Sequence, residues 1–448
     1  MTKNKLFLTN TLSRNKEEFK PQTPGKILMY VCGVTPYDNA HIGHGRCYVT
    51  FDVLYRLLQF LGNDVAYARN FTDIDDKLLN RAEKELGDRL RYQEIAEKYI
   101  KSFTQDMHDL NCLTPTFQPR ATQTIDAMID LIQRLIEKGH AYVVDGDVYY
   151  AVRSFPEYGK LSKRQLEDLQ AGARVEINDK KRDPLDFALW KTEPEGTFWK
   201  SPWGYGRPGW HIECSAMAST LLAPHIDLHG GGMDLIFPHH ENEIAQSEGV
   251  YGPNFANYWL HNAFVRINQE KMSKSLGNFF TIRDIFKEFD PMVVRFYYLN
   301  HNYNIPLDFS HDGLQAAEKS YKRLVRVFED VNADAITNEQ LQQSSIIEKM
   351  LSFLCDDLNT AGVFGVLFEN LDQLKAKPEE AAMVKRFLNI VLGLTLLPLK
   401  EKIVEITPGI QALIDQRETA RVAKDWAMAD KIRDQLRAMG VELQDKKL

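Results

Sequence analysis

The fold is decided by residues 26–73, whose sequence is "KILMYVCGVTPYDNAHIGHGRCYVTFDVLYRLLQFLGNDVAYARNFTD". Residues 26–34 form a continuous apolar run, which is typical of a buried parallel strand. Apolar residues then recur at helical spacing over 47–62, where Gly62 is placed to end a helix. Residues 64–73 have the pattern of a second strand. Strand, loop, helix and strand make a βαβ unit, so we predict an α/β fold with a doubly wound, Rossmann-type parallel sheet.

Length and composition restrict the class of protein. A chain of 448 residues is too long for one core, so we expect two to four domains. The longest apolar run, residues 390–399, is about half a bilayer span, and we expect no membrane segment. Five scattered cysteines favour a reducing cytoplasm and roles in metal binding or packing. A net charge of −7 argues against general polyanion binding, so an RNA partner would need a local basic surface.

The pattern along the chain predicts several further segments. Residues 90–140 are amphipathic and helical, residues 140–204 look irregular, and 225–250 read as strand, Gly-rich turn and helix. From about Asp312 the pattern is helical, with a break at 398–409. The predicted domains are the first half of the α/β domain (1–139), an insertion (140–204), the second half of the α/β domain (205–285), a linker (286–311), a helical bundle (312–400) and a C-terminal module (401–448).

Two short motifs have the composition of phosphate sites. The first is "HIGH", with His41 and His44 at the start of the predicted helix and Gly43 between them. Ligands of open α/β sheets bind outside the carboxyl ends of the strands, and helix N-termini attract phosphate. The second is "KMSKS" (271–275), in which Lys271 and Lys274 flank small polar residues. Alone, the first could be an ordinary surface loop and the second a solvated charge run.

"HIGH" followed by "KMSKS" in this order resembles the paired signature of class I aminoacyl-tRNA synthetases. The surrounding sequence resembles the cysteinyl-tRNA synthetase family over nearly the whole chain. The segments that carry this resemblance are "MYVCGVTPYDNAHIGHGR" (29–46), "NFTDIDDK" (70–77), "DFALWK" (186–191), "SPWGYGRPGWHIECSAM" (201–217), "HGGGMDLIFPHHENEIAQS" (229–247) and "RVAKDWAMADKIRDQL" (421–436).

The resemblance implies one zinc ion per chain, held by Cys32, Cys214, His239 and Glu243. Two thiolates, an imidazole and a carboxylate are zinc-ligand chemistry, although each cysteine alone could be structural. His239 and Glu243 are four residues apart, which places them on one face of a helix. We expect Cys214 to follow a tight turn at 206–210. Three other cysteines are interpreted as packing residues: Cys47, Cys112 and Cys355.

The family's reaction is ATP-dependent ligation of L-cysteine to tRNA(Cys) through cysteinyl-adenylate, with Mg²⁺ accompanying ATP. Zinc would distinguish cysteine from the nearly isosteric serine, because it binds a thiolate far better than a hydroxyl. We therefore expect an open coordination position and no editing domain. The implied ATP-binding residues are His41, His44, Gly232, Asp234 and Lys274, with Lys271 in support. The implied amino-acid site comprises Cys32, Gly33, Thr72, Trp210, His211 and His229. Trp210 could instead be a core residue.

For tRNA, the resemblance points to Arg421, Trp426 and Asp430 on a C-terminal helix, because exposed anticodon bases stack on aromatic side chains and pair with Arg and Asp. The same helix would also suit a simple packed face. We expect a monomeric, cytoplasmic enzyme.

Three other functions stay open. At Pro36 the sequence resembles the related ligase that joins cysteine to an aminosugar-inositol in mycothiol synthesis. That ligase would not need the helix predicted at 421–436. A zinc-dependent RNA-binding paralogue without catalysis would not need both phosphate motifs. A zinc hydrolase would need an H-E-x-x-H arrangement, which "HHENE" does not supply.

Overall fold

The computed structural model describes residues 5–166, 179–267, 270–271, 280–399 and 408–438. The chain divides into two compact units, Met1–Leu397 and Pro398–Leu448. The boundary between them falls at the start of the break that the sequence pattern indicates. The finer divisions of the first unit stay predictions.

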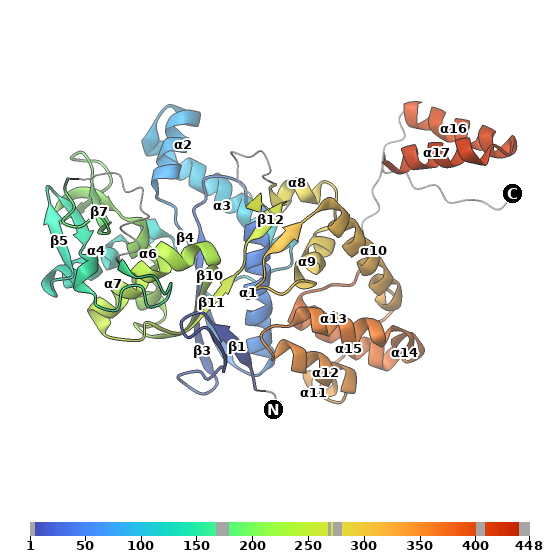
Figure 1. The fold of residues 1–448 in the computed structure, drawn as a ribbon, viewed down its shortest axis with the longest axis horizontal. Helices are drawn as coiled ribbons and strands as arrows, with labels where there is room; N and C mark the ends of the chain where they lie inside the picture. Colours follow the sequence, from blue (N-terminus) through green and yellow to red (C-terminus); the bar gives the residue numbers. More distant parts are fainter. Residues whose placement is uncertain (1–4, 167–178, 268–269, 272–279, 400–407, 439–448) are drawn as a thin grey trace. The chain divides into compact units, whose positions relative to one another are not determined.

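The centre of the first unit is a four-stranded parallel sheet in the order β11-β10-β3-β4 (Figure 1). Its strands are β3 (Lys26–Val34), β4 (Asp64–Phe71), β10 (Ile226–Gly232) and β11 (Ala256–Asn262). Helix α1 (Ile42–Phe60) connects β3 to β4, and α7 (Glu241–Tyr251) lies between β10 and β11. The prediction of a doubly wound α/β fold is confirmed.

The glycine-rich turn expected after β10 is wrong. Gly230, Gly231 and Gly232 are the last residues of the strand itself. A Cβ on Gly230 would lie 2.3 Å from the ring of Phe51 on α1. Gly230 therefore allows α1 to pack closely against the strand, and the strand is followed by a single helical turn at Met233–Leu235.

The insertion is not irregular as expected but contains a five-stranded antiparallel sheet in the order β5-β6-β7-β9-β8. Its strands are β5 (Ala141–Val144), β6 (Asp147–Tyr150), β7 (Phe187–Thr192), β8 (Trp199–Ser201) and β9 (Gly204–Pro208). The tight turn expected at 206–210 is also wrong, because Gly206 pairs with both Thr192 and Trp199. Cys214 follows this strand within helix α6 (Trp210–Leu221).

Further elements surround the parallel sheet. They are the hairpin β1 (Phe7–Asn10) and β2 (Asn15–Glu18), the helices α2 (Asp76–Leu86), α3 (Tyr92–Asp109) and α4 (Ile125–Glu137), the short strands β12 (Val265–Ile267), β13 (Glu270–Lys271) and β14 (Leu307–Phe309), and the helices α8 (Ile282–Phe286) and α9 (Pro291–Leu299). Single helical turns lie at Arg89–Arg91, Ala121–Gln123 and Val152–Ser154.

The rest of the first unit is helical, as predicted. The helices are α10 (His311–Phe328), α11 (Asn338–Leu341), α12 (Ser345–Leu354), α13 (Thr360–Glu369), α14 (Leu371–Ala376) and α15 (Pro378–Leu392). The second unit contains α16 (Pro408–Val422) and α17 (Trp426–Ala438), whose core is Ile432 and Leu436 packed against residues of α16. Within the described part of the chain, no helix is both long enough and apolar enough to cross a membrane.

Candidate active site

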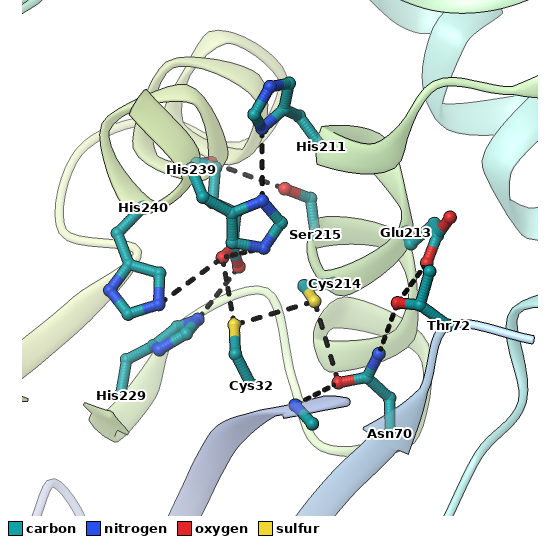
Figure 2. Close-up of polar contacts among 12 residues, drawn as sticks. Cys32, Asn70, Thr72, His211, Glu213, Cys214, Ser215, His229, His239 and His240 are labelled. Carbon is teal, nitrogen blue, oxygen red and sulfur yellow. Dashed lines mark hydrogen bonds and ion pairs between the residues drawn. The ribbon is translucent and has the colours of Figure 1, made fainter. Parts of the chain in front are cut away.

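Four side chains from four separate elements meet at the carboxyl end of the parallel sheet (Figure 2). Cys32 comes from β3, Cys214 from α6, Glu243 from α7 and His239 from the helical segment Ile236–His240 before α7. Their potential ligand atoms all lie within 4.8 Å of one another, and all four side chains are buried. The structure thus brings together the four residues that the sequence resemblance assigns to zinc.

The spacing of these atoms suits a single metal ion. Cys32 Sγ lies 3.6 Å from Cys214 Sγ and 3.3 Å from Glu243 Oε1, and His239 Nε2 lies 3.1 Å from the same oxygen. A tetrahedral zinc shell with bonds of about 2.0–2.3 Å has edges of roughly 3.3–3.8 Å. Burial raises the pKa of both thiols, and the neighbouring Glu243 adds to this effect. The donor set therefore fits a buried cation, which would favour the thiolate forms.

Outer side chains orient the imidazole of His239. His211 Nδ1 lies 3.1 Å from His239 Nδ1, while Gln246 donates to the His211 carbonyl at 2.8 Å. Trp210 stacks on the His239 ring with a centroid separation of 4.2 Å. The Trp210 side chain is 38% exposed, so its alternative role as a core residue is wrong. A ligating histidine is commonly fixed in this way by a partner at its second ring nitrogen.

A second group of buried donors adjoins the first and shares Cys32 and Glu243 with it: Cys32, His229, His240 and Glu243. His229 Nε2 lies 2.8 Å from Glu243 Oε2. His240 Nδ1 lies 2.8 Å from His261 Nε2. Sequence reasoning identified His229 but missed His240 and His261. The doubled histidine in "HHENE" was a signal for His240, whereas nothing local marks His261.

Thr72 supports the cluster from beside it. Its hydroxyl donates to the buried Glu213 at 2.7 Å, and Asn70 Nδ2 donates to the same hydroxyl at 3.3 Å. Asn70 Oδ1 accepts from the backbone N–H of Gly33 at 2.8 Å and lies 3.7 Å from Cys214 Sγ. Burial raises the pKa of Glu213 well above its ordinary value, which suits a carboxyl held within this network. Asn70 and Glu213 are site residues that the sequence did not reveal.

A cavity of about 400 Å³ connects this cluster with the "HIGH" segment. Its described lining includes Cys32 and Gly33 at the end of β3, Trp210 on α6, His41 and His44 at the start of α1, and Gly232 and Asp234 after β10. Thr72, His211 and His229 are not among its described lining residues. The cavity lies where β3 and β10 diverge, which is the usual ligand position in such sheets.

His41 and His44 form a reciprocal cap at the start of α1. His41 Nδ1 accepts from the backbone N–H groups of Gly43 and His44 at 3.1 and 3.3 Å, and His44 Nδ1 accepts from the N–H of His41 at 3.3 Å. The two rings stack with centroids 3.6 Å apart. A neutral imidazole that accepts at Nδ1 carries its proton on Nε2, so each Nε2 is a donor.

Because of this cap, a phosphate at the start of α1 would not be bound by the backbone N–H groups of the helix, as the sequence suggested. The N–H groups of Gly43 and His44 are engaged by the His41 ring and that of Ile42 by the Phe280 carbonyl, so we expect ring N–H groups rather than these backbone N–H groups to donate to a phosphate. Burial, helped by His41 and Lys77, lowers the pKa of His44 well below its ordinary value and keeps the ring neutral. A Cβ on Gly43 would lie 3.0 Å from the His41 ring, so the glycine makes room for the cap.

Arg46 is a buried residue that the sequence analysis did not single out. Its guanidinium donates to four backbone carbonyls, those of Ala263, Phe264, Asn302 and Ile305, at 2.7–3.1 Å. Ala263 and Phe264 line the cavity. Burial lowers the pKa of Arg46 to about 10, which leaves it charged at neutral pH. Arg46 therefore fixes one wall of the cavity to α1.

Two groups of predicted residues lie elsewhere. Lys274 is outside the described residues, and Lys271 is described only as backbone of β13. In the second unit, Trp426 is 56% exposed, so the alternative of a buried tryptophan is wrong. Asp430 pairs with Arg433 at 2.9 Å, and Arg421 is half-buried near the end of α16.

A parallel sheet with a cavity at its switch point and "HIGH" at the start of the first crossover helix defines a class I aminoacyl-tRNA synthetase. The family model "tRNA synthetases class I (C) catalytic domain" matches residues 18–319, and the model "Cysteinyl-tRNA ligase anticodon binding domain" matches residues 404–447. The solved methionyl-tRNA synthetase of Mycobacterium tuberculosis shares the fold, with a TM-score of 0.56 at 13% identity, covering 82% of this chain and 92% of that one. A solved arginyl-tRNA synthetase from Campylobacter jejuni, described as putative, gives a TM-score of 0.52 at 14% identity, covering 86% and 95%.

Curated relatives identify the family. The cysteine–tRNA ligase of Trichlorobacter lovleyi is 46% identical and that of Geobacter metallireducens 47% identical, each over 98% of both chains. The chain belongs to the cysteine–tRNA ligase family.

Proposed function

We propose that this chain joins L-cysteine to tRNA(Cys) through cysteinyl-adenylate, using a bound zinc ion to select the thiol. The observation that carries the proposal is the meeting of Cys32, Cys214, His239 and Glu243 beside a cavity that also presents the paired histidines of α1. Cys32 belongs both to this group of four residues and to the lining of the cavity. A side chain bound at the metal would therefore leave its carboxylate inside the same cavity as the phosphates of ATP.

Zinc at this cluster would supply a soft Lewis acid that favours a thiolate over a hydroxyl. Such selection is needed because a purely apolar pocket separates close analogues by only about 10–200-fold. Cys32, Cys214, His239 and Glu243 would hold the ion. His229 would orient Glu243, because its Nε2 lies 2.8 Å from the second carboxylate oxygen.

In adenylate formation, a carboxylate oxygen of cysteine attacks the α-phosphorus of ATP, the bond to the bridging oxygen breaks, and pyrophosphate leaves. His41 and His44 would donate their Nε2–H groups to phosphate oxygens as charge develops. Both rings are neutral donors in this account and take no proton. Lys271 and Lys274 would add positive charge, and Mg²⁺ would accompany ATP. A hydroxyl of the terminal adenosine of tRNA then attacks the carbonyl carbon, and AMP leaves.

The other predicted residues have supporting roles. Trp210 is half-exposed at the cavity and would cover the bound amino acid. Asp234 is exposed beside Gly232 and would accept from the ribose hydroxyls. His211 and His229 contact His239 and Glu243, and Thr72 contacts Asn70, whose Oδ1 lies 3.7 Å from Cys214 Sγ. We therefore assign these three residues to orientation of the metal ligands rather than to contact with cysteine.

The second unit would read the tRNA. The exposed Trp426 offers a stacking surface, and Asp430 on the same helix and Arg421 on α16 would offer polar groups. This assignment favours tRNA over an aminosugar as the acceptor. One ion per chain, a monomeric state and a cytoplasmic location stay predictions.

Metal content and substrate selection test the proposal together. Purified protein is assayed for bound zinc and for exchange of pyrophosphate into ATP with cysteine or serine. The variant Cys214→Ser is compared with Cys355→Ser, because Cys355 is equally buried but lies after α12, away from the cluster. We expect Cys214→Ser to lose zinc and at least tenfold of its cysteine-dependent exchange, and Cys355→Ser to keep both.

Three results would contradict the proposal. They are normal exchange in metal-free protein, retention of zinc and cysteine selectivity by Cys214→Ser, and transfer of cysteine to an aminosugar but not to tRNA. The last would leave the metal site intact and change only the acceptor.

A further inference from the structure

Residues 280–282, which follow the "KMSKS" motif (271–275) after four further residues, pair with the backbone of the "HIGH" segment. Ile282 N donates to Ala40 O at 2.9 Å, and Ile42 N donates to Phe280 O at 3.3 Å. His41 and Thr281 form the bridge between these two bonds. The backbone that presents His41 is therefore held directly by the segment that begins α8.

Arg283, the next residue of α8, ties this pairing to helix α3. Its Nε donates to Ser102 Oγ at 2.9 Å, and its Nη2 donates to Ser102 O at 3.0 Å. The Ser102 hydroxyl in turn donates to Asn39 Oδ1 at 2.8 Å, two residues before His41. Because the hydroxyl has a single proton, the bond that it accepts from Arg283 directs that proton toward Asn39.

The same arginine faces an unusual carboxyl group. Asp106 on α3 is fully buried, and Arg283 Nε lies 3.1 Å from its Oδ1. Neither carboxylate oxygen accepts a hydrogen bond from any described residue. Among those residues, the charged groups that act on it are Arg283 from α8 and Asp109 from its own helix. A buried acid with so little compensation is destabilising when ionised, and the contact with Arg283 opposes this cost.

We propose that Arg283 is a positioning residue for adenylate formation, held by Asp106 and Ser102 so that the 280–283 segment keeps the backbone at His41 in register. The inference rests on the proposed role of His41 at the phosphates. Removing Arg283 detaches the 280–283 segment from Ser102 of α3 and removes the bond that directs the Ser102 hydroxyl toward Asn39, while leaving the cysteine end of the cavity unchanged. Small misplacements of a catalytic group lower the turnover rate by as much as about 100-fold.

The experiment measures kcat and KM for pyrophosphate exchange in the full chain, together with thermal unfolding. The main variant is Arg283→Ala, with Lys287→Ala as the matched control, because Lys287 is an exposed cation at the end of the same helix that pairs with Asp284 rather than with α3. We expect Arg283→Ala to lower kcat about 10- to 100-fold with KM for cysteine within twofold of the parent. Arg283→Lys should recover part of the loss, and Lys287→Ala should match the parent.

Asp106→Asn supplies a readout that a purely structural role would not give, with Asp109→Asn as its control. At pH 8 we expect Asp106→Asn to raise Tm and yet to lower kcat, because it removes the buried charge that holds Arg283. This variant keeps the proposal testable if Arg283→Ala does not fold. The proposal is overturned if Arg283→Ala retains kcat within twofold, or if Asp106→Asn gains stability with unchanged kcat.

His41→Ala, assayed in parallel, separates this inference from the proposed function. Full exchange by His41→Ala would contradict the assignment of the phosphate site itself. Loss of exchange in His41→Ala with normal exchange in Arg283→Ala would overturn only the role of Arg283.

Discussion

His41 and His44 cap each other at the start of α1, each using Nδ1 to accept a backbone N–H from the other's residue. The two histidine rings therefore have two roles. Their Nδ1 atoms stabilise the helix end, and their Nε2–H groups are donors beside the cavity. Substitution of His41 can separate these two roles.

Replacing His41 by asparagine should separate the cap from the chemistry. Asparagine is a good N-cap residue, so His41→Asn should keep the free energy of unfolding, whereas His41→Ala should lose about 1 kcal/mol. Both variants lack the ring donor, and both should lose about 100- to 1,000-fold in the rate of pyrophosphate exchange. Denaturant unfolding and exchange kinetics measure the two effects. A fully active His41→Asn would mean that His41 is only a cap.

Arg46 and Arg56 lie on the same helix and are both buried, but only Arg46 contacts the cavity wall. Arg56 donates instead to carbonyls of Asn111, Asn389 and Ile390 and pairs with Asp52. Lysine cannot reproduce the fork of a guanidinium, so both Arg→Lys variants should lose about 1–3 kcal/mol of stability for each carbonyl left unpaired. Only Arg46→Lys should raise KM for ATP, about tenfold. Equal values of KM in the two variants would exclude a specific role for Arg46 at the nucleotide.

The pH dependence of stability should carry the signature of Asp106. Burial raises its pKa from 3.8 to about 7, opposed by Arg283 and reinforced by Asp109. The folded state thus retains a proton that the unfolded state has already released. The stabilisation of the folded state by this proton is complete below about pH 4 and is lost as the pH rises to about 7. The loss of stability is as much as about 4 kcal/mol. Asp106→Asn should therefore be more stable than the parent above pH 7 and similar to it near pH 4. Parallel stability curves across this range would contradict the assignment.

Trp426 should matter for tRNA and not for folding. Because its side chain is 56% exposed, Trp426→Ala should change the free energy of unfolding by less than about 0.5 kcal/mol. Loss of a stacking contact of about 1–3 kcal/mol should raise KM for tRNA about 5- to 150-fold, without affecting pyrophosphate exchange. Met428→Ala, at a 48% exposed position of the same helix, is the matched control. Equal effects of the two substitutions would remove the reason to assign Trp426 to base stacking.

The sequence was sufficient where local pattern and structure agree. The buried strand at 26–34, the helix ending near Gly62 and the strand from 64 are all present, because hydrophobic period and caps act within each segment. The four metal-ligand candidates were found from a resemblance, and the i, i+4 spacing of His239 and Glu243 does bring their side chains together.

The sequence was misleading where distant segments decide the outcome. The insertion looked irregular because its strands are only 3–6 residues long, and they become regular by pairing with distant strands, as Val148 does with Trp190. Glycines at 230–232 suggested a turn, yet they end strand β10, where Gly230 allows the close approach of Phe51. Arg46 and Asp106 carry no local signal, since their roles depend on partners more than a hundred residues away.

The central claim is that the sulfur of the substrate cysteine binds the zinc ion proposed at Cys32, Cys214, His239 and Glu243. X-ray absorption at the zinc edge, recorded on the purified protein with and without cysteine and with serine as the control, tests it most directly. We expect a shell containing two sulfur atoms in the free protein, a third sulfur when cysteine is added, and no change with serine. A shell that keeps two sulfurs in saturating cysteine would contradict the claim, even if the protein charges tRNA.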